Sequence, residues 1–235
     1  MNIETVLSPS LFKHVEMLSS KVVIVIDILR ATSTITTILD QGASSVIAVS
    51  DATEAFAYLN EGYLVGGERN GETIPGFNFG NSPIQYIDED ILDKTIVLTT
   101  TNGTKCIEMS KNASEVIMGS FLNLSAVVDY SKKTEKDIVL FCAGWKDKIN
   151  LEDSLFAGAF IAQFPNVKLD DSSLLCLDAY EASKSNLFES LKNSNHFNRL
   201  KSKGVLRDIE YCCQVDTINS VPILQHGKIV TMRDS

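Results

Sequence analysis

Short, strongly apolar runs recur along the first two thirds of the chain. The clearest is Val22–Ile26, five consecutive β-branched residues with no polar position between them. A run without alternation is typical of a strand that is buried on both faces of a sheet, most often a parallel one. Comparable runs lie at residues 45–49, 96–98, 116–118 and 138–141. The pattern predicts a parallel or mixed central sheet with Val22–Ile26 in its interior.

Segments with helical character separate these runs, at about 33–41, 52–60, 104–111 and 123–132. Asp51, with Glu54 three residues later, forms a capping-box pattern that marks the start of the second one. Alternating strands and helices predict an α/β fold in which helices cover the sheet.

The last third of the chain changes character after residue 151. Helices are predicted at about 152–164, 174–192 and 205–213, followed by a closing strand pair at 222–224 and 228–231. We treat residues 1–235 as a single α/β unit and leave open a helical C-terminal annex that begins at about 151.

Residues 66–83 break this rhythm with many glycines, two prolines and three asparagines. No regular element fits the segment, and its length exceeds the four to six residues, roughly, of an ordinary connection. We expect a functional loop that carries Glu68 and Arg69, with Asn81 and Ser82 at its far end; the alternative is a passive surface excursion.

Composition and charge narrow the class of protein. The chain has 235 residues, 44% of them hydrophobic, and a formal net charge of −9. That charge disfavours nucleic acid and anionic membranes as partners. Five cysteines without a CxxC pair, and no basic and apolar leader at the N-terminus, favour a reduced, cytoplasmic protein. An anionic, phosphorylated substrate would need a local cation.

Polar side chains follow the first apolar run directly. Asp27 is costly to bury unless a metal ion or an arginine pairs with it; the alternative is a structural aspartate that caps the next helix or pairs with Arg30. Arg30 carries a permanent, forked positive charge. Thr32 and Ser33, with Thr34, stand where a helix begins, so they could cradle an anion or simply cap that helix.

Three further segments carry candidate site residues. Asn102, Gly103 and Thr104 form a turn into a helix where a ligand could approach the backbone, although a plain turn explains them too. Glu68 is a candidate metal ligand or general base, or else a solvated loop carboxylate. Glu152 and Asp153 open a helix, where the helix dipole alone favours acids.

Several phosphate-binding motifs are absent, among them GxxxxGK[ST] and a GxGxxG after a strand, and the three histidines are too scattered to predict a zinc site. Seven short blocks in order nevertheless resemble the 2-phosphosulfolactate phosphatase family. They are DILRATS from Asp27, GER from Gly67, PGF from Pro75 with GNSP from Gly80, TTNGT from Thr100, GS from Gly119 with Asn123, CAG from Cys142, and ED at 152–153. Residues around His196 and Asp208 fit more loosely.

The resemblance implies a Mg²⁺-dependent hydrolase with an unusual α/β fold, which converts (R)-2-phospho-3-sulfolactate to 3-sulfolactate in coenzyme M biosynthesis. On the residues and the resemblance together we expect catalytic roles for Asp27, Arg30 and Glu68. The expected metal ligands are Asp27, Glu68, Glu152 and Asp153. The expected substrate-binding residues are Thr32, Ser33, Arg69, Asn81, Ser82, Asn102, Gly103, Thr104 and Asn123.

The chain departs from the family pattern at two places. Asn78 stands where the family usually carries Asp, and residues 145–148 do not match the usual run. Two other functions therefore stay open: a phosphatase for another small phosphorylated acid, and a non-catalytic protein that binds small anions. The sequence leaves open whether attack comes from water or from Asp27, and whether the chain forms a homo-oligomer.

Overall fold

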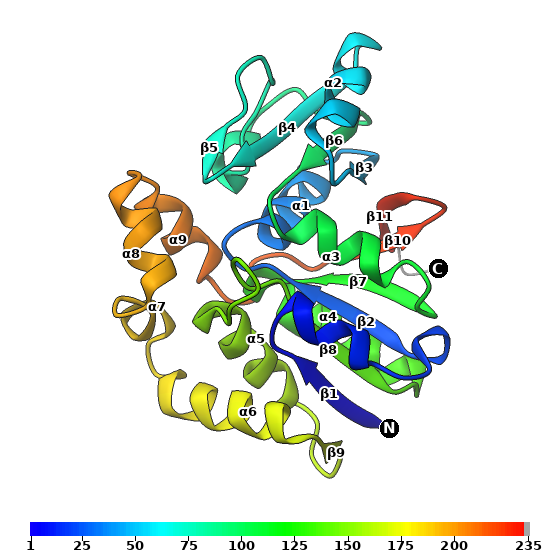
Figure 1. Cartoon of the computed structure of the whole chain (residues 1–235), viewed down its shortest axis with the longest axis vertical. Helices are drawn as coiled ribbons and strands as arrows, with labels where there is room; N and C mark the ends of the chain where they lie inside the picture. Colours follow the sequence, from blue (N-terminus) through cyan, green and yellow to red (C-terminus); the bar gives the residue numbers. More distant parts are fainter. Residues whose placement is uncertain (233–235) are drawn as a thin grey trace.

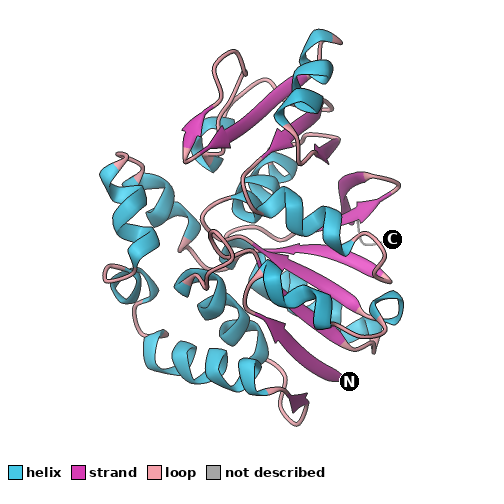
Figure 2. Ribbon diagram, viewed as in Figure 1, coloured by secondary structure: helices cyan, strands magenta, loops and turns pink. Residues whose placement is uncertain are grey.

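The computed structural model describes residues 1–232. Their strands form one mixed sheet of 11 strands in the order β5-β4-β6-β3-β11-β10-β7-β2-β8-β1-β9, with helices packed against it (Figures 1 and 2). The predicted α/β class is confirmed. The strands are β1 (Asn2–Val6), β2 (Val22–Ile26), β3 (Ser45–Ala48), β4 (Leu64–Arg69), β5 (Glu72–Thr73), β6 (Thr95–Thr99), β7 (Glu115–Gly119), β8 (Ile138–Cys142), β9 (Lys168–Leu169), β10 (Val221–Gln225) and β11 (Lys228–Met232).

The sheet consists of two parallel blocks. The large block contains β7, β2, β8, β1 and β9, and the small block contains β4, β6 and β3. The C-terminal hairpin β10–β11 joins them with antiparallel pairings, Ile223 to Ile117 on one side and Ile229 to Val46 on the other. The last strands of the chain therefore complete the middle of the sheet, and the two blocks are its wings.

β2 lies in the interior of the large block, as predicted. It pairs in parallel with β7 on one side and β8 on the other, and none of its five residues is exposed. Apolar side chains on both faces of a strand require a hydrophobic layer on each side. One layer comes from helices α4 (Leu124–Thr134) and α5 (Leu151–Ile161), and the other includes α1 (Ala31–Asp40) and α3 (Gly103–Ser110).

Most predicted elements are confirmed within a few residues, including α2 (Ala52–Asn60), α9 (Leu206–Cys212) and the closing hairpin. Asp51 caps α2 by accepting a hydrogen bond from the N–H of Thr53. The helix predicted at 174–192 is instead two helices, α6 (Asp171–Ser183) and α7 (Leu187–Leu191), because Asn186 caps a new start. Strand β1 and helix α8 (Asn195–Ser202) were not predicted.

The prediction of an irregular segment from residue 66 was wrong at its start. Residues 66–69 belong to strand β4, so Glu68 and Arg69 are strand residues. The glycines reflect crowding there: a side chain on Gly66 would collide with the Tyr86 hydroxyl, and a Cβ on Gly67 would lie 2.6 Å from the Thr99 carbonyl oxygen. A glycine pair in a strand therefore marks a place where the neighbouring chain leaves no room for Cβ atoms.

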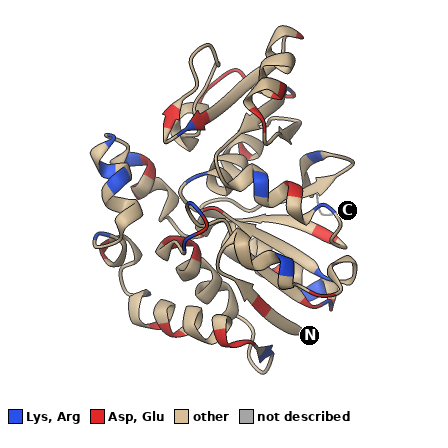
Figure 3. Ribbon diagram, viewed as in Figure 1, with Lys and Arg blue, Asp and Glu red and all other residues tan. Residues whose placement is uncertain are grey.

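Within residues 1–232, none of the helices combines the length and the hydrophobicity that a membrane crossing requires. Figure 3 shows lysines and arginines gathered on α8, among them Arg199 and Lys201.

Candidate active site

A cavity lies where strand ends of the two blocks meet helix α8. The carboxyl ends of β2 and β8 lie together because these strands are parallel, and the same holds for β4 and β6. Residues at or just after these four ends line the cavity, and α/β sheets generally bind ligands at the carboxyl ends of strands. The lining residues are Asp27, Leu29, Arg30, Glu68, Asn70, Gly71, Asn81, Thr101, Asn102, Gly144, Trp145, His196, Arg199 and Leu200. The structure therefore brings the predicted Asp27, Arg30, Glu68, Asn81 and Asn102 together.

Asp27 directly follows β2 and enters this cavity. Its Oδ1 accepts a hydrogen bond from the N–H of Ala31 at 3.3 Å, in the first turn of α1. A Cβ on Gly103 would lie 2.8 Å from Oδ2 and would collide with Ala31, so glycine there leaves the carboxylate its space. Burial raises the pKa of Asp27 to about 6, and the nearby negative charges of Glu68 and Glu152 add to the effect.

Glu68 fixes two backbone turns at the edge of the cavity and is only 8% exposed. Its Oε1 accepts hydrogen bonds from the N–H and the hydroxyl of Thr101, each at 2.8 Å. Its Oε2 accepts from the N–H of Gly71 at 2.6 Å. Glu68 is therefore a structural tie between the turn after β4 and the turn after β6, as well as an acid at the site.

Asp153 ties together two turns of the large block. Its two carboxylate oxygens accept from the N–H groups of Ile28 and Gly144, each at 3.0 Å. Burial raises the pKa of Asp153, and the charges of Glu152 and Asp27 raise it further. Asp153 does not line the cavity. The structure thus gives it a positioning task, because it holds the turns that carry Asp27 and Trp145.

Glu152, His196 and Arg199 form a chain of contacts that sequence reasoning missed. Oε1 of the fully buried Glu152 meets Nδ1 of His196, and Nε2 of His196 lies 2.7 Å from a terminal nitrogen of Arg199. Because arginine can only donate, Nε2 is the acceptor and Nδ1 carries the proton that is donated to Glu152. The only signal was the loose match around His196, since Glu152 lies 44 residues away in sequence.

Arg30 is paired with a carboxylate from the C-terminal helices. Its guanidinium forms an ion pair with Oδ2 of Asp208 on α9, and both side chains are less than a tenth exposed. The other oxygen of Asp208 accepts from the Ser82 hydroxyl at 2.8 Å. Arg30 thus lies at the cavity as predicted, but its charge is largely neutralised, and Ser82 is bonded to Asp208.

The hydroxyls at the start of α1 are bonded within the protein. Thr32 and Ser33 donate to the carbonyl oxygens of Asp27 and Ile28, at 3.0 and 2.9 Å. Both side chains are fully buried, and neither lines the cavity. They stabilise the turn that presents Asp27; their direct contact with an anion stays a prediction.

Residues 7–227 match the sequence profile described as 2-phosphosulpholactate phosphatase. The chain belongs to this family. It is 47% identical over 207 residues to a protein of Thermotoga maritima named probable 2-phosphosulfolactate phosphatase, covering 88% of this chain and 90% of the relative. Relatives with the same name occur in Caldanaerobacter subterraneus subsp. tengcongensis (41% identical, 92% and 93% covered) and Carboxydothermus hydrogenoformans (39%, 98% and 97%).

The two departures from the family pattern lie in different places. The side-chain oxygen of Asn78 accepts from the N–H of Val65 at 2.9 Å, so it supports the start of β4 and does not line the cavity. Trp145 does line the cavity, and the guanidinium carbon of Arg199 lies 4.6 Å from the centre of its ring. Only the second departure can contact a ligand in this cavity.

The remaining predicted family residues are spread over several places. Asn123 is bonded to Ser120 and to the carbonyl oxygens of Met118 and Ser220, and it does not line the cavity. Thr104 donates to the Thr100 carbonyl oxygen at 3.0 Å. Arg69 donates to Thr99 and to the Glu68 carbonyl oxygen, and likewise does not line the cavity. Ligand contacts of these three residues stay predictions.

The predicted metal ligands differ in what they still offer. Among residues 1–232, no group of three or more His, Cys, Asp and Glu side chains is arranged to hold a metal ion. Both oxygens of Glu68 and of Asp153 accept hydrogen bonds, as described above. Oε2 of Glu152, which like Asp153 does not line the cavity, is however buried without a partner, and Oδ2 of Asp27 forms no hydrogen bond to the described protein. This donor set fits Mg²⁺, which commonly uses one or two carboxylates and completes its shell with water and phosphate.

Proposed function

We propose that this chain is a magnesium-dependent phosphatase that hydrolyses (R)-2-phospho-3-sulfolactate to 3-sulfolactate and phosphate, as in coenzyme M biosynthesis. The relatives named above support the substrate. The observation that carries the chemistry is Asp27, a carboxylate with a free oxygen, held at the carboxyl end of a fully buried strand in a cavity with two arginines.

The charges of the cavity suit a metal-bound phosphate ester. Burial raises the pKa of Asp27, and Glu68 and Glu152 lie near enough for their negative charges to raise it further. Asp27 and Glu152 would hold Mg²⁺, which relieves that repulsion and, when bound, withdraws charge from the phosphoryl oxygens. The arginines Arg30 and Arg199 add positive charge around a substrate that carries phosphate, carboxylate and sulfonate groups.

Asp27 performs the central step in either of two routes. A pKa of about 6 leaves its carboxylate mostly ionised at pH 7. In one route the carboxylate attacks phosphorus, the ester oxygen leaves with its electron pair, and water later hydrolyses the aspartyl-phosphate. In the other, the carboxylate accepts a proton from the water that attacks phosphorus, the ester P–O bond breaks, and the ester oxygen leaves with its electron pair and is protonated to the alcohol. In both routes the N–H of Ala31 holds the carboxylate by a hydrogen bond, and the absence of a side chain on Gly103 leaves room for it.

The test is phosphate release from 2-phospho-3-sulfolactate by the wild type and by Asp27→Asn, each with Mg²⁺ and with EDTA. We expect EDTA to abolish turnover, and Asp27→Asn to lower kcat by at least about 1,000-fold, because the reacting carboxylate is lost. Asp129→Asn is the matched control, since Asp129 is exposed on α4. Equal turnover in EDTA, or an active Asp27→Asn, contradicts the mechanism.

A panel of phosphorylated hydroxy acids tests the substrate. If the proposal is right, the sulfonate-bearing ester has the highest kcat/KM by a wide margin. A higher value for another phosphorylated acid would keep the phosphatase and replace its substrate, whereas binding without any phosphate release would indicate a non-catalytic anion-binding protein.

A further inference from the structure

Two arginines line the cavity, and only one of them is ion-paired with a carboxylate in the described chain. Arg30 is paired with Asp208. Within the described chain, Arg199 forms no ion pair with a carboxylate; its hydrogen-bond partner is His196, and its buried Nε has no partner at all. A buried donor without a partner is costly, and it is satisfied when a ligand supplies an acceptor. Arg199 therefore has no carboxylate bonded to it, although Glu68 and Glu152 lie near enough to favour its positive charge.

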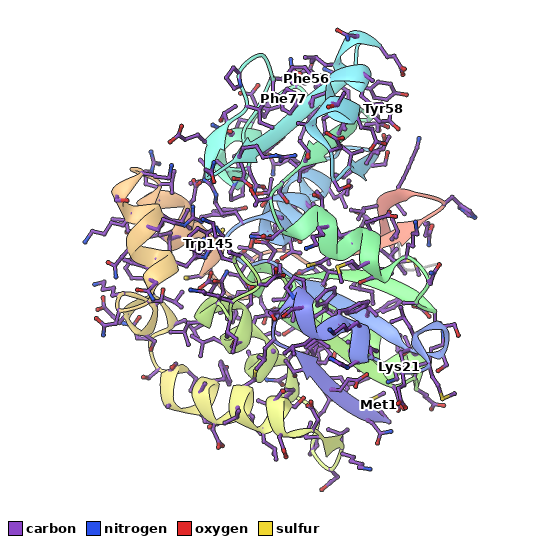
Figure 4. The ribbon with its side chains drawn as sticks, in the orientation of Figure 1. Met1, Lys21, Phe56, Tyr58, Phe77 and Trp145 are labelled. Carbon is purple, nitrogen blue, oxygen red and sulfur yellow. The ribbon has the colours of Figure 1, made fainter. Side chains whose placement is uncertain are left out.

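The guanidinium of Arg199 is held in place from two sides. The ring of Trp145 lies against it, with 4.6 Å between the ring centre and the guanidinium carbon. Nε2 of His196 accepts from one terminal nitrogen at 2.7 Å, and Glu152 fixes the imidazole from its other side. Figure 4 shows Trp145 beside helix α8, at the centre of the molecule where the strand ends meet. An arginine restrained in this way loses little further entropy when its free N–H groups bind an oxyanion.

Arg199 also belongs to a different wall from the reacting carboxylate. Asp27 comes from the end of β2, whereas Arg199 comes from α8, together with His196 and Leu200. The reacting phosphate belongs next to Asp27. A second cation on another element is therefore suited to a second negative group on the same substrate.

We propose that Arg199 binds the acidic group on the carbon skeleton of the substrate, and that Trp145 and His196 are positioning residues for its guanidinium. The inference rests on the proposed function of the site. Carboxylate and sulfonate share the chemistry that matters here, because each presents two oxygens to the forked N–H groups of an arginine.

Three phosphate esters separate the two groups. They are 2-phospho-3-sulfolactate, 2-phospholactate, which lacks the sulfonate, and the phosphate ester of 2-hydroxyethanesulfonate, which lacks the carboxylate. We measure kcat and KM for each with the wild type, Arg199→Gln and the control Lys201→Gln, which removes an exposed charge from the same helix.

We expect Arg199→Gln to lower kcat/KM for the full substrate about 10- to 100-fold, mainly through KM, because a charge-assisted contact is lost. The loss is expected to disappear for the ester that lacks the group bound by Arg199, so that ester identifies the group. An equal loss for all three esters, or a loss as small as that of Lys201→Gln, overturns the proposal.

The positioning role has its own test. Trp145→Leu is expected to reduce the preference for the full substrate as Arg199→Gln does, and Trp145→Phe, which keeps an aromatic face, to recover most of it. If Leu and Phe behave alike, the ring does not position Arg199. Should the wild type hydrolyse none of the esters, the proposed function fails; calorimetric Kd values of the same three compounds then decide the role of Arg199 independently, with the same expected pattern.

Discussion

The two parallel blocks of the sheet differ in how firmly they are packed. In the large block, β2 has apolar layers on both faces, one of them a cluster that extends through α4, α5 and the C-terminal helices. The second face of the small block has a buried core of only Val49, Ala55, Val65 and Val97. Regions with few buried apolar contacts open at lower free energy. The candidate site therefore lies between a rigid support for Asp27 and a softer support for Glu68.

Buried polar ties compensate for that difference at the cavity. Glu68 bonds two turns of the small block to each other. Asp208 bonds Arg30 of the large block to Ser82, which follows the small-block strand β4 and its antiparallel neighbour β5. We expect the molecule to depend on these ties more than on the small core to hold the two halves of the site in register.

The largest expected effect is on the tie between the blocks. Arg30→Ala leaves the carboxylate of Asp208 buried without its partner, which should cost about 3–5 kcal/mol of unfolding free energy. Urea denaturation measures it, with the exposed neighbour Arg207→Ala as control. The double variant Arg30→Met/Asp208→Leu removes both charges and should regain much of the loss. A cost below about 1 kcal/mol would show that the pair does not hold the blocks together. If Arg30→Ala folds, we also expect this variant to have a higher KM than the wild type.

A smaller effect on stability, of opposite sign, is expected from a change at Asp27, which the large block supports. Burial raises the pKa of Asp27 from 3.8 to about 6 in the folded protein. The folded state therefore binds the proton more tightly than the unfolded one, and the associated stability, present below pH 4, is lost as the pH rises through about 6. In metal-free protein, Asp27→Asn should be more stable than the wild type by about 2 kcal/mol at pH 8, allowing for solvent in the cavity.

Most of that advantage should be gone at pH 4, where Asp27 is protonated in the folded protein and only partly ionised in the unfolded one. Thermal unfolding in EDTA at several pH values measures it. A constant difference between the two proteins from pH 4 to pH 8 would mean that Asp27 is not the group whose pKa is raised.

The smallest effect is expected from a change at Glu68, which the small block supports. Glu68→Gln places an amide group where the carboxylate accepts from Thr101 or Gly71, so one of these N–H groups loses its acceptor. We expect kcat/KM to fall about 5- to 10-fold, since a buried hydrogen bond is worth about 1 kcal/mol. Hydrogen exchange in residues 70–82 should become faster, whereas Glu61→Gln, exposed in the same block, should change neither. Unchanged exchange would mean that Glu68 does not order this segment.

The same exchange measurement tests the loop prediction. We expect residues 70–82 of the wild type to be protected when Mg²⁺ and substrate bind, because Asn70, Gly71 and Asn81 line the cavity. Equal exchange with and without ligand would leave the segment a passive surface excursion.

The local sequence pattern was enough to predict the central strand and the α/β class of the fold. Val22–Ile26 forms a central strand because a continuous β-branched run can be accommodated only between two apolar layers. The place of Asp27 follows from the same run, since the residue after a buried parallel strand lies at the edge where ligands bind. The glycine pair of β4 could not be recognised as part of a strand, because its cause is the approach of Tyr86 and Thr99, which no local pattern contains.

Which side chains meet at the site was decided by the tertiary structure alone. Glu152 and His196 are 44 residues apart, and Arg30 and Asp208 are 178 apart. The sequence shows two acids at a helix start and an arginine after a strand. These side chains could equally be free to bind a ligand or be paired with other side chains of the protein. Only the packing of α8 and α9 against the strand ends pairs Arg30 with Asp208 and leaves Arg199 without a bonded carboxylate, because the state of a buried charge depends on the partners that folding brings to it.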